Sequence, residues 1–183
     1  MRGVGEWRRR RIQIPFTSHE LHSLFSQVQS FQLQPSDHFP NHPIDRVGGA
    51  TVWIALDDVL PEQGSISFLS GSHRAGPLGR TYSSGTRTDG RDLLEQNPWL
   101  LEQYPVAPPL TLRPGDATFH HPLTVHGAGA NLTDRPRWSF IAMYVDADSV
   151  YTGAAYPATD DLGLRPGFPF DHPAFPVVWE GDR

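Results

Sequence analysis

Hydrophobic and polar residues alternate with a period of two in several short stretches, a pattern typical of strands that bury one face. The clearest stretch is residues 138–145. Similar but shorter patterns predict strands at residues 51–56, 65–69, 110–113 and 117–121. A further apolar run ends at Val125 and His126, which places His126 at the end of its strand.

Helical spacing of hydrophobic residues is rare in this chain. Leu21, Leu24, Phe25 and Val28 lie at helical spacing and predict a short amphipathic helix. Residues 92–104 predict a second short helical region, interrupted at a proline. The C-terminal stretch from residue 151 onward has many Pro and Gly residues and no clear period, so we expect coil that wraps the core.

The composition supports a mainly β fold with tight turns. The 183 residues include 17 Gly and 18 Pro, which favour many short strands over long helices. We predict a double-stranded β-helix, the jelly-roll or cupin-like arrangement, with a few short helices. We expect one such domain at residues 35–183, preceded by a divergent or truncated N-terminal segment at residues 1–34.

The net charge and the cysteine content limit the classes of binding partner and metal site that we expect. The net charge is −5 and no long basic stripe is present, so a nucleic-acid partner is not expected. The absence of cysteine excludes disulfides, thiolate metal sites and cysteine nucleophiles, and agrees with the cytoplasmic location that we expect. No apolar run approaches about 20 residues, so no membrane partner is expected. The sequence does not indicate an oligomeric state.

The segment from His126 to Arg137 carries the most informative chemistry. His126 follows an apolar run, a turn of small residues comes next, and Arg137 follows His126 by 11 residues. That layout suits an imidazole that binds a metal on one strand and a guanidinium that binds a carboxylate on the next.

These residues, together with residues 51–58, resemble the phytanoyl-CoA dioxygenase family of Fe(II)- and 2-oxoglutarate-dependent oxygenases. The likeness lies in His126, Gly127, Asn131 and Arg137, and each part alone would be weak. The resemblance implies a jelly roll, Fe(II) as the metal and 2-oxoglutarate as cosubstrate. It also implies a dioxygenase, an oxidoreductase that hydroxylates a small-molecule or acyl substrate. Iron in such enzymes is held by two histidines and one carboxylate on one face.

The resemblance assigns a role to each candidate residue. His126 takes the place of the second iron-binding histidine, and Asp37, which precedes Trp53 by 16 residues, takes that of the carboxylate ligand. Arg137 is the predicted anchor for the distal carboxylate of 2-oxoglutarate, and Trp53 is predicted to line the cosubstrate pocket. Arg135 is the alternative anchor, but it fits the family spacing less well.

One position departs from the family pattern. The first iron-binding histidine should lie two residues before Asp37, where this chain has Pro35, which offers no ligand atom. His42 or His38 could supply the third ligand if this segment is irregular. Whether the chain is an active enzyme is therefore open at this point.

Three neighbouring features are interpreted as structural. Ser72 lies in a turn where its side chain is expected to satisfy backbone groups. His121 is expected to be a hydrogen-bonded histidine of the core rather than a ligand. Asp57 and Asp58 are adjacent acids and are expected to be solvated.

Three functions remain open from the sequence. The first is an active oxygenase of the kind described above. The second is a catalytically impaired or truncated relative that keeps the fold and binds 2-oxoglutarate through Arg137. The third is a non-enzymatic β-sandwich that acts as a binding module, in which the histidines are structural.

Overall fold

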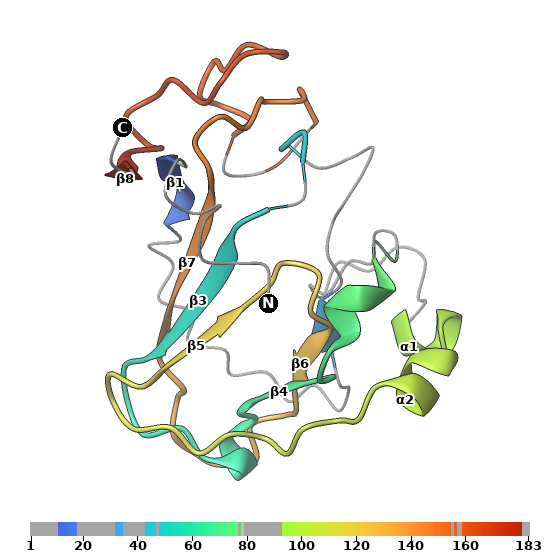
Figure 1. Cartoon of the computed structure of the whole chain (residues 1–183). Helices are drawn as coiled ribbons and strands as arrows, with labels where there is room; N and C mark the ends of the chain where they lie inside the picture. Colours follow the sequence, from blue (N-terminus) through green and yellow to red (C-terminus); the bar gives the residue numbers. More distant parts are fainter. Residues whose placement is uncertain are drawn as a thin grey trace.

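The computed structural model describes residues 11–17, 32–34, 43–46, 48–76, 78, 93–154, 156 and 159–180. Two antiparallel sheets face each other, with the larger one at the left of Figure 1 and the smaller one at the right. The larger sheet has the order β5-β3-β7-β1-β8. Its strands are β1 (Arg11–Thr17), β3 (Ala50–Ala55), β5 (Ala117–His120), β7 (Ser139–Asp146) and β8 (Val177–Glu180).

The smaller sheet has the order β2-β6-β4. Its strands are β2 (Gln32–Gln34), β4 (Ile66–Phe68) and β6 (His126–Ala128). From β1 to β7, consecutive strands alternate between the two sheets, so the chain winds back and forth across the core. This winding is the jelly-roll arrangement that the sequence predicts, and the mainly β fold class is confirmed.

Two strands come from the segment expected to be divergent. β1 pairs with β7 and β8, while β2 pairs with β6. The first 34 residues thus contribute one strand to each sheet, and the proposed division at residue 34 stays a prediction. The predicted helix around Leu21–Val28 lies outside the described residues.

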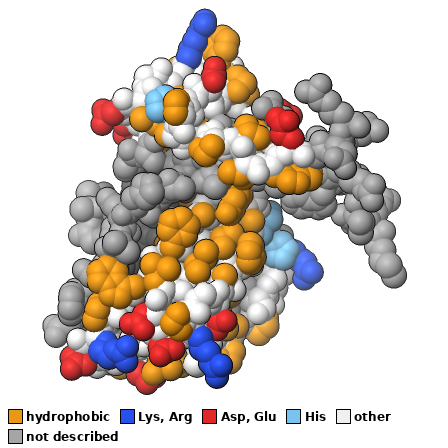
Figure 2. All heavy atoms as spheres, turned by 90° about the vertical axis from the view of Figure 1, so that its left-hand side faces the viewer, with side chains coloured by type: hydrophobic (Ala, Val, Ile, Leu, Met, Phe, Trp, Pro, Cys, Tyr) orange, Lys and Arg blue, Asp and Glu red, His pale blue; other side chains and the backbone are white. Residues whose placement is uncertain are grey.

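The register of the larger sheet decides which side chains face the smaller sheet. Thr51 of β3 lies opposite His120 of β5, and Trp53 lies opposite Thr118. Directly opposed residues share a face, so Trp53 and His120 point to one side of the sheet. Phe119 points to the other side and is 74% exposed. Figure 2 shows this outer side, where hydrophobic side chains gather at the centre.

The predicted helical region at residues 92–104 is confirmed as two short helices. They are α1 (Leu93–Gln96) and α2 (Trp99–Gln103), separated at Pro98. Leu93, Leu100 and Tyr104 pack against Leu69 and Val125, next to the smaller sheet. Two 3-10 turns, Pro61–Gln63 and Ser72–Ala75, complete the helical elements of the described residues. Within these ranges no helix is long and apolar enough to cross a membrane.

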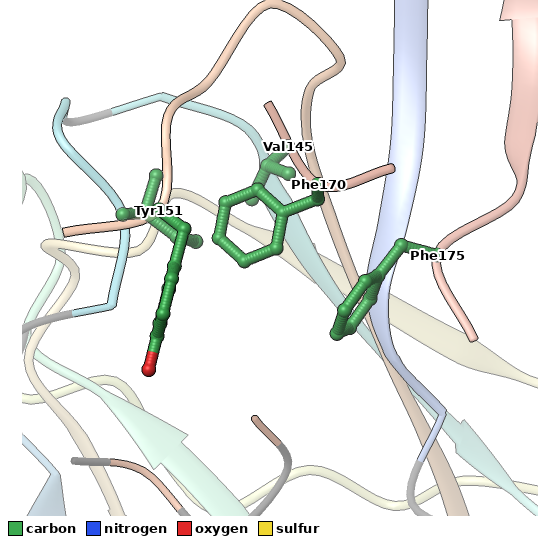
Figure 3. Packing of buried hydrophobic residues seen from close by; sticks show 5 residues of the cluster. Val145, Tyr151, Phe170 and Phe175 are labelled. Carbon is green, nitrogen blue, oxygen red and sulfur yellow. The ribbon is translucent and has the colours of Figure 1, made fainter. Parts of the chain in front are cut away.

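The C-terminal stretch packs onto the end of the larger sheet. Tyr151, Phe170 and Phe175 are buried against Val145 of β7, and their rings meet edge to face (Figure 3). The expectation of coil is correct for most of this stretch but wrong at its end, where β8 adds a strand beside β1. The predicted strand at residues 110–113 is also wrong. Only Leu112 pairs there, in a single bridge with Val59.

Candidate functional site

His126 begins β6 instead of ending a strand, which corrects the prediction from the sequence. The residues before it form a turn, in which the Thr124 N–H donates to the His121 carbonyl oxygen at 2.8 Å. Pro122 lies inside this turn and has no N–H to donate to a strand ladder. His126 pairs with Phe68 of β4 and Gln34 of β2, so it occupies the central strand of the smaller sheet.

The hydrogen bonding of His126 leaves one ring nitrogen free. Its Nδ1 lies 2.9 Å from the Thr124 carbonyl oxygen, so Nδ1 carries the proton and donates. Nε2 then carries the lone pair, and among the described residues it has no hydrogen-bond partner. Burial lowers the pKa of the His126 imidazole, which keeps the ring neutral. A neutral imidazole oriented by a carbonyl on its other nitrogen is the form that binds metals.

A buried imidazole lies beside the partly buried His126. The ring of His120 is centred 4.7 Å from that of His126 and 5.1 Å from that of Phe68. His120 is 8% exposed, and neither of its ring nitrogens has a hydrogen-bond partner in the part of the chain that the structure describes. Burial, followed by the neighbouring His126, lowers the pKa of His120 to about 3. The ring is therefore neutral over the physiological range.

Sequence reasoning missed His120 because the local hydrophobic pattern predicts that its side chain faces solvent. In the run Ala117-Thr118-Phe119-His120, hydrophobicity alone would turn Phe119 inward and His120 outward. Pairing with β3 places His120 opposite Thr51 and reverses that choice. The available signal was the pair of adjacent histidines, because two neighbours in an extended strand face opposite ways.

Arg137 lies two residues before β7 and is half-buried. Burial lowers the pKa of its guanidinium, and no ion pair or hydrogen bond engages its side chain within the described residues. The alternative anchor, Arg135, is exposed and contacts the Asp57 carboxylate at 3.4 Å. A half-buried guanidinium without a carboxylate partner can accept an anionic ligand, and Arg137 has this property while Arg135 does not.

The side chain of one asparagine stabilises the turn that precedes Arg137. The Asn131 side chain donates to the Arg135 carbonyl oxygen at 2.7 Å. Its Oδ1 accepts from the Thr133 N–H at 3.0 Å and from the Thr133 hydroxyl at 2.8 Å. These bonds close the turn between β6 and β7, and so fix the direction in which the chain reaches Arg137.

Trp53 is 7% exposed and belongs to a hydrophobic cluster with Ala55, Val59 and Leu112. These core contacts are sufficient to explain why Trp53 is buried. Its face of β3 is nevertheless the one that His120 shares across the strand pair. A role for Trp53 in lining the cosubstrate pocket stays a prediction.

The segment with the remaining predicted ligands lies outside the described residues. It includes Asp37, Pro35, His38 and His42. In the part of the chain that the structure describes, no three His, Cys, Asp or Glu side chains form a group that could hold a metal. The imidazoles of His120 and His126 do fit a metal ion, because among the described residues no hydrogen bond engages either ring nitrogen of the buried His120 or the Nε2 of the partly buried His126.

The features interpreted as structural make the local contacts expected of them, while the expectation that His121 is not a ligand stays a prediction. The Val125 N–H donates to Ser72 Oγ at 2.8 Å, and both groups are buried. His121 Nδ1 accepts the Leu123 N–H at 3.1 Å within the turn before β6. Asp57 is partly exposed and pairs at the surface with Arg135. Ser72 thus holds the residue that directly precedes His126.

With this geometry in place, comparison with known proteins identifies the family. The family model described as Phytanoyl-CoA dioxygenase (PhyH) matches residues 21–139, which is more than half of the chain. The chain belongs to the phytanoyl-CoA dioxygenase family. A probable phytanoyl-CoA dioxygenase of Caenorhabditis elegans is 25% identical over 118 residues, and so is the peroxisomal phytanoyl-CoA dioxygenase of Homo sapiens.

Solved structures of the same superfamily agree with the fold. The non-haem α-ketoglutarate-dependent carbocyclase SnoK from nogalamycin biosynthesis superposes with a TM-score of 0.65 at 31% identity, over 81% of this chain. The epimerase SnoN, in complex with Fe3+, α-ketoglutarate and nogalamycin RO, superposes with a TM-score of 0.57 at 33% identity, over 82% of this chain. The jelly-roll fold of this family is thereby confirmed.

The chain is much shorter than these relatives. It spans 36% of the length of the nematode protein and 34% of the human one. It spans 55% of the SnoK chain and 59% of the SnoN chain. The cytoplasmic location stays a prediction, and the human relative is a peroxisomal protein.

Proposed function

We propose that this chain is an Fe(II)- and 2-oxoglutarate-dependent oxygenase that oxidises a C–H bond of a small-molecule substrate. The observation that carries the proposal is the Nε2 of the neutral, partly buried His126, which has no hydrogen-bond partner among the described residues. The half-buried Arg137, whose side chain has no ion pair within the described part of the chain, supports it as the partner for a cosubstrate carboxylate. Both residues belong to a chain of a family whose relatives depend on iron and α-ketoglutarate.

His126 would hold the metal through Nε2, with Asp37 as the proposed carboxylate ligand. The Thr124 carbonyl fixes the tautomer and the orientation of the ring. Because burial lowers the pKa of His126, a proton does not compete with the metal at neutral pH. When bound, Fe(II) with 2-oxoglutarate and O₂ supplies the oxidising chemistry, and 2-oxoglutarate is decarboxylated to succinate.

Arg137 would orient the cosubstrate through its distal carboxylate. The planar guanidinium offers two parallel N–H donors to one carboxylate, which fixes position as well as charge. Since Arg137 is half-buried, this ion pair is screened less by water than a surface pair. The aromatic ring of Phe68, 5.9 Å from that of His126, helps to keep water away from the metal side.

The structural relatives support a small-molecule substrate. SnoK is a carbocyclase and SnoN an epimerase, both from nogalamycin biosynthesis. They are 31% and 34% identical to this chain, against 25% for the two phytanoyl-CoA dioxygenases. We propose a compound of this kind rather than an acyl thioester. The outcome is hydroxylation or another result of C–H oxidation.

Anaerobic titration with Fe(II) and 2-oxoglutarate tests the proposal. The ternary complex should give the weak visible charge-transfer band of iron-bound 2-oxoglutarate, and His126→Ala should abolish it. Arg137→Ala should weaken 2-oxoglutarate binding by at least about 10-fold, since a hydrogen bond to a charged group contributes about 1.5–3 kcal/mol. Arg135→Ala is the matched control, because Arg135 is exposed and already paired with Asp57. Equal losses in the two arginine variants would contradict the assignment.

Pro35 favours a second candidate function, the catalytically impaired relative. It lies where the family has its first iron-binding histidine. The same titration distinguishes this candidate, because 2-oxoglutarate would bind in an Arg137-dependent manner without the charge-transfer band. A chain that binds neither metal nor 2-oxoglutarate would instead be a binding module.

A further inference from the structure

We propose that His120 is a metal ligand. Together with His126 it supplies the two imidazoles of the site, so that no histidine is needed at position 35, where the chain has a proline. The inference rests on the proposed function only in assuming that a metal binds at His126. It adds a ligand from β5, on the opposite sheet from β6. The metal would then be held between the two sheets of the jelly roll.

The distance between the two rings fits a shared ion. With metal–nitrogen bonds of about 2.1 Å and a ring radius of about 1.1 Å, two imidazoles bound at about 90° have centres about 4.5 Å apart. The observed separation of the His120 and His126 ring centres is 4.7 Å. The rings are inclined by 54°, so they are not stacked face to face.

The unpartnered nitrogens of His120 point to a missing ligand. Both its Nδ1 and Nε2 are buried, and neither has a hydrogen-bond partner among the described residues. A buried polar group in this state costs about 1–3 kcal/mol, and native proteins rarely tolerate it without a functional reason. If His120 served only to pack against Phe68 and His126, a phenylalanine would fill the same space without this cost. A coordinate bond from one nitrogen removes part of the cost.

A ligand role for His120 would also explain how the chain can bind a metal although it has Pro35 in place of a histidine. Proline has no side-chain ligand atom, so the family's first histidine cannot be replaced from that position. His120 reaches the neighbourhood of His126 from a different strand, because its register with Thr51 turns it toward the smaller sheet. The two imidazoles need no contribution from His38 or His42.

Co(II) is the probe for this site, because it is coloured, paramagnetic and binds nitrogen ligands more tightly than Fe(II). Wild-type protein with ¹⁵N-labelled histidine should show two strongly shifted ring signals on Co(II) addition. His120→Phe should keep one of them. It should also weaken Co(II) binding by at least about 100-fold, more than the loss of an outer-shell partner causes. His172→Gln is the control, since His172 Nδ1 instead accepts the Ala174 N–H in the C-terminal stretch.

The outcomes separate this inference from the proposed function. If Co(II) affinity depends on His126 but is unchanged in His120→Phe, His120 is only a packing residue and the inference is wrong, while the metal site stands. If neither His120→Phe nor His126→Ala changes the Co(II) affinity, both this inference and the proposed function are wrong. Should His120→Phe not fold, the wild-type spectrum still tests the inference, because a single shifted ring would exclude His120.

Discussion

At the scale of single residues, the site depends on imidazoles that remain uncharged. The rings of His120 and His126 lie side by side, and no carboxylate among the described residues contributes to the pKa of either ring. Burial lowers both pKa values, and the neighbouring His126 further lowers the pKa of His120. The same property that leaves the lone pairs available to a metal makes the metal-free protein sensitive to acid.

The metal-free protein should therefore lose stability as the pH falls. The folded pKa of His120 is about 3, below the unfolded value of about 6.5, so between these values only the unfolded chain takes up the proton. Stability from this residue is complete above pH 6.5 and decreases down to about pH 3. Between pH 7 and pH 5, wild type should lose about 2 kcal/mol more than His120→Phe, measured by urea unfolding. Parallel losses in both proteins would contradict a neutral buried His120.

At the scale of elements, the connection between β6 and β7 links the metal residue to the arginine. The Asn131 side chain closes this turn through three hydrogen bonds, and the Leu132 N–H donates to the Glu62 carbonyl oxygen at 2.8 Å. The turn also approaches Gly64, where an added Cβ would lie 2.2 Å from the Gly129 carbonyl oxygen. These contacts fix the backbone of the turn and thereby restrict the position from which the Arg137 side chain extends.

Asn131→Ala should both destabilise the fold and weaken 2-oxoglutarate binding. The loss of three hydrogen bonds in a partly exposed turn is expected to cost about 1–3 kcal/mol of unfolding free energy. The affinity for 2-oxoglutarate should fall because Arg137 is less well oriented. Both quantities can be measured by thermal unfolding with and without the cosubstrate. Leu132→Ala, an exposed neighbour in the same turn, should change neither.

At the scale of the whole molecule, the jelly roll is closed at one end by the C-terminal stretch. Phe170 and Phe175 cover Val145 of β7 and the ring of Tyr151 (Figure 3). The Tyr151 N–H donates to the Phe168 carbonyl oxygen at 2.9 Å, which ties the two parts of this stretch together. Hydrophobic side chains gather at the centre of the outer side of the larger sheet (Figure 2). Phe119 of β5 is 74% exposed.

The closing cluster should contribute strongly to global stability. Phe170 is 2% exposed, and Phe170→Ala should cost about 3–5 kcal/mol through the cavity it leaves. Phe168 lies two residues away and is 45% exposed, with the Arg165 guanidinium 4.0 Å from its ring centre. Phe168→Ala should cost less than about 1.5 kcal/mol, because a cation–π contact at an exposed site is weak. Similar unfolding midpoints for the two variants would show that the stretch is not part of the cooperative core.

The sequence by itself determined the elements whose signals are local. Alternation along residues 138–145, the break at Pro98 and the role of Ser72 all follow from neighbours a few residues apart. It also predicted the fold class, because the strand and turn pattern and the His126–Arg137 segment together resemble one family. Arg137 was preferred to Arg135 on spacing alone, and the surface pairing of Arg135 with Asp57 agrees with that preference.

Tertiary structure decided what depends on pairing between distant strands. Whether Phe119 or His120 faces the core is set by the register of β5 on β3, since shifting a strand by one residue turns every side chain over. The partnership of His120 with His126 requires two sheets to meet, and no spacing along the chain encodes it. The start of β6 at His126 likewise follows from its pairing with β4 and β2.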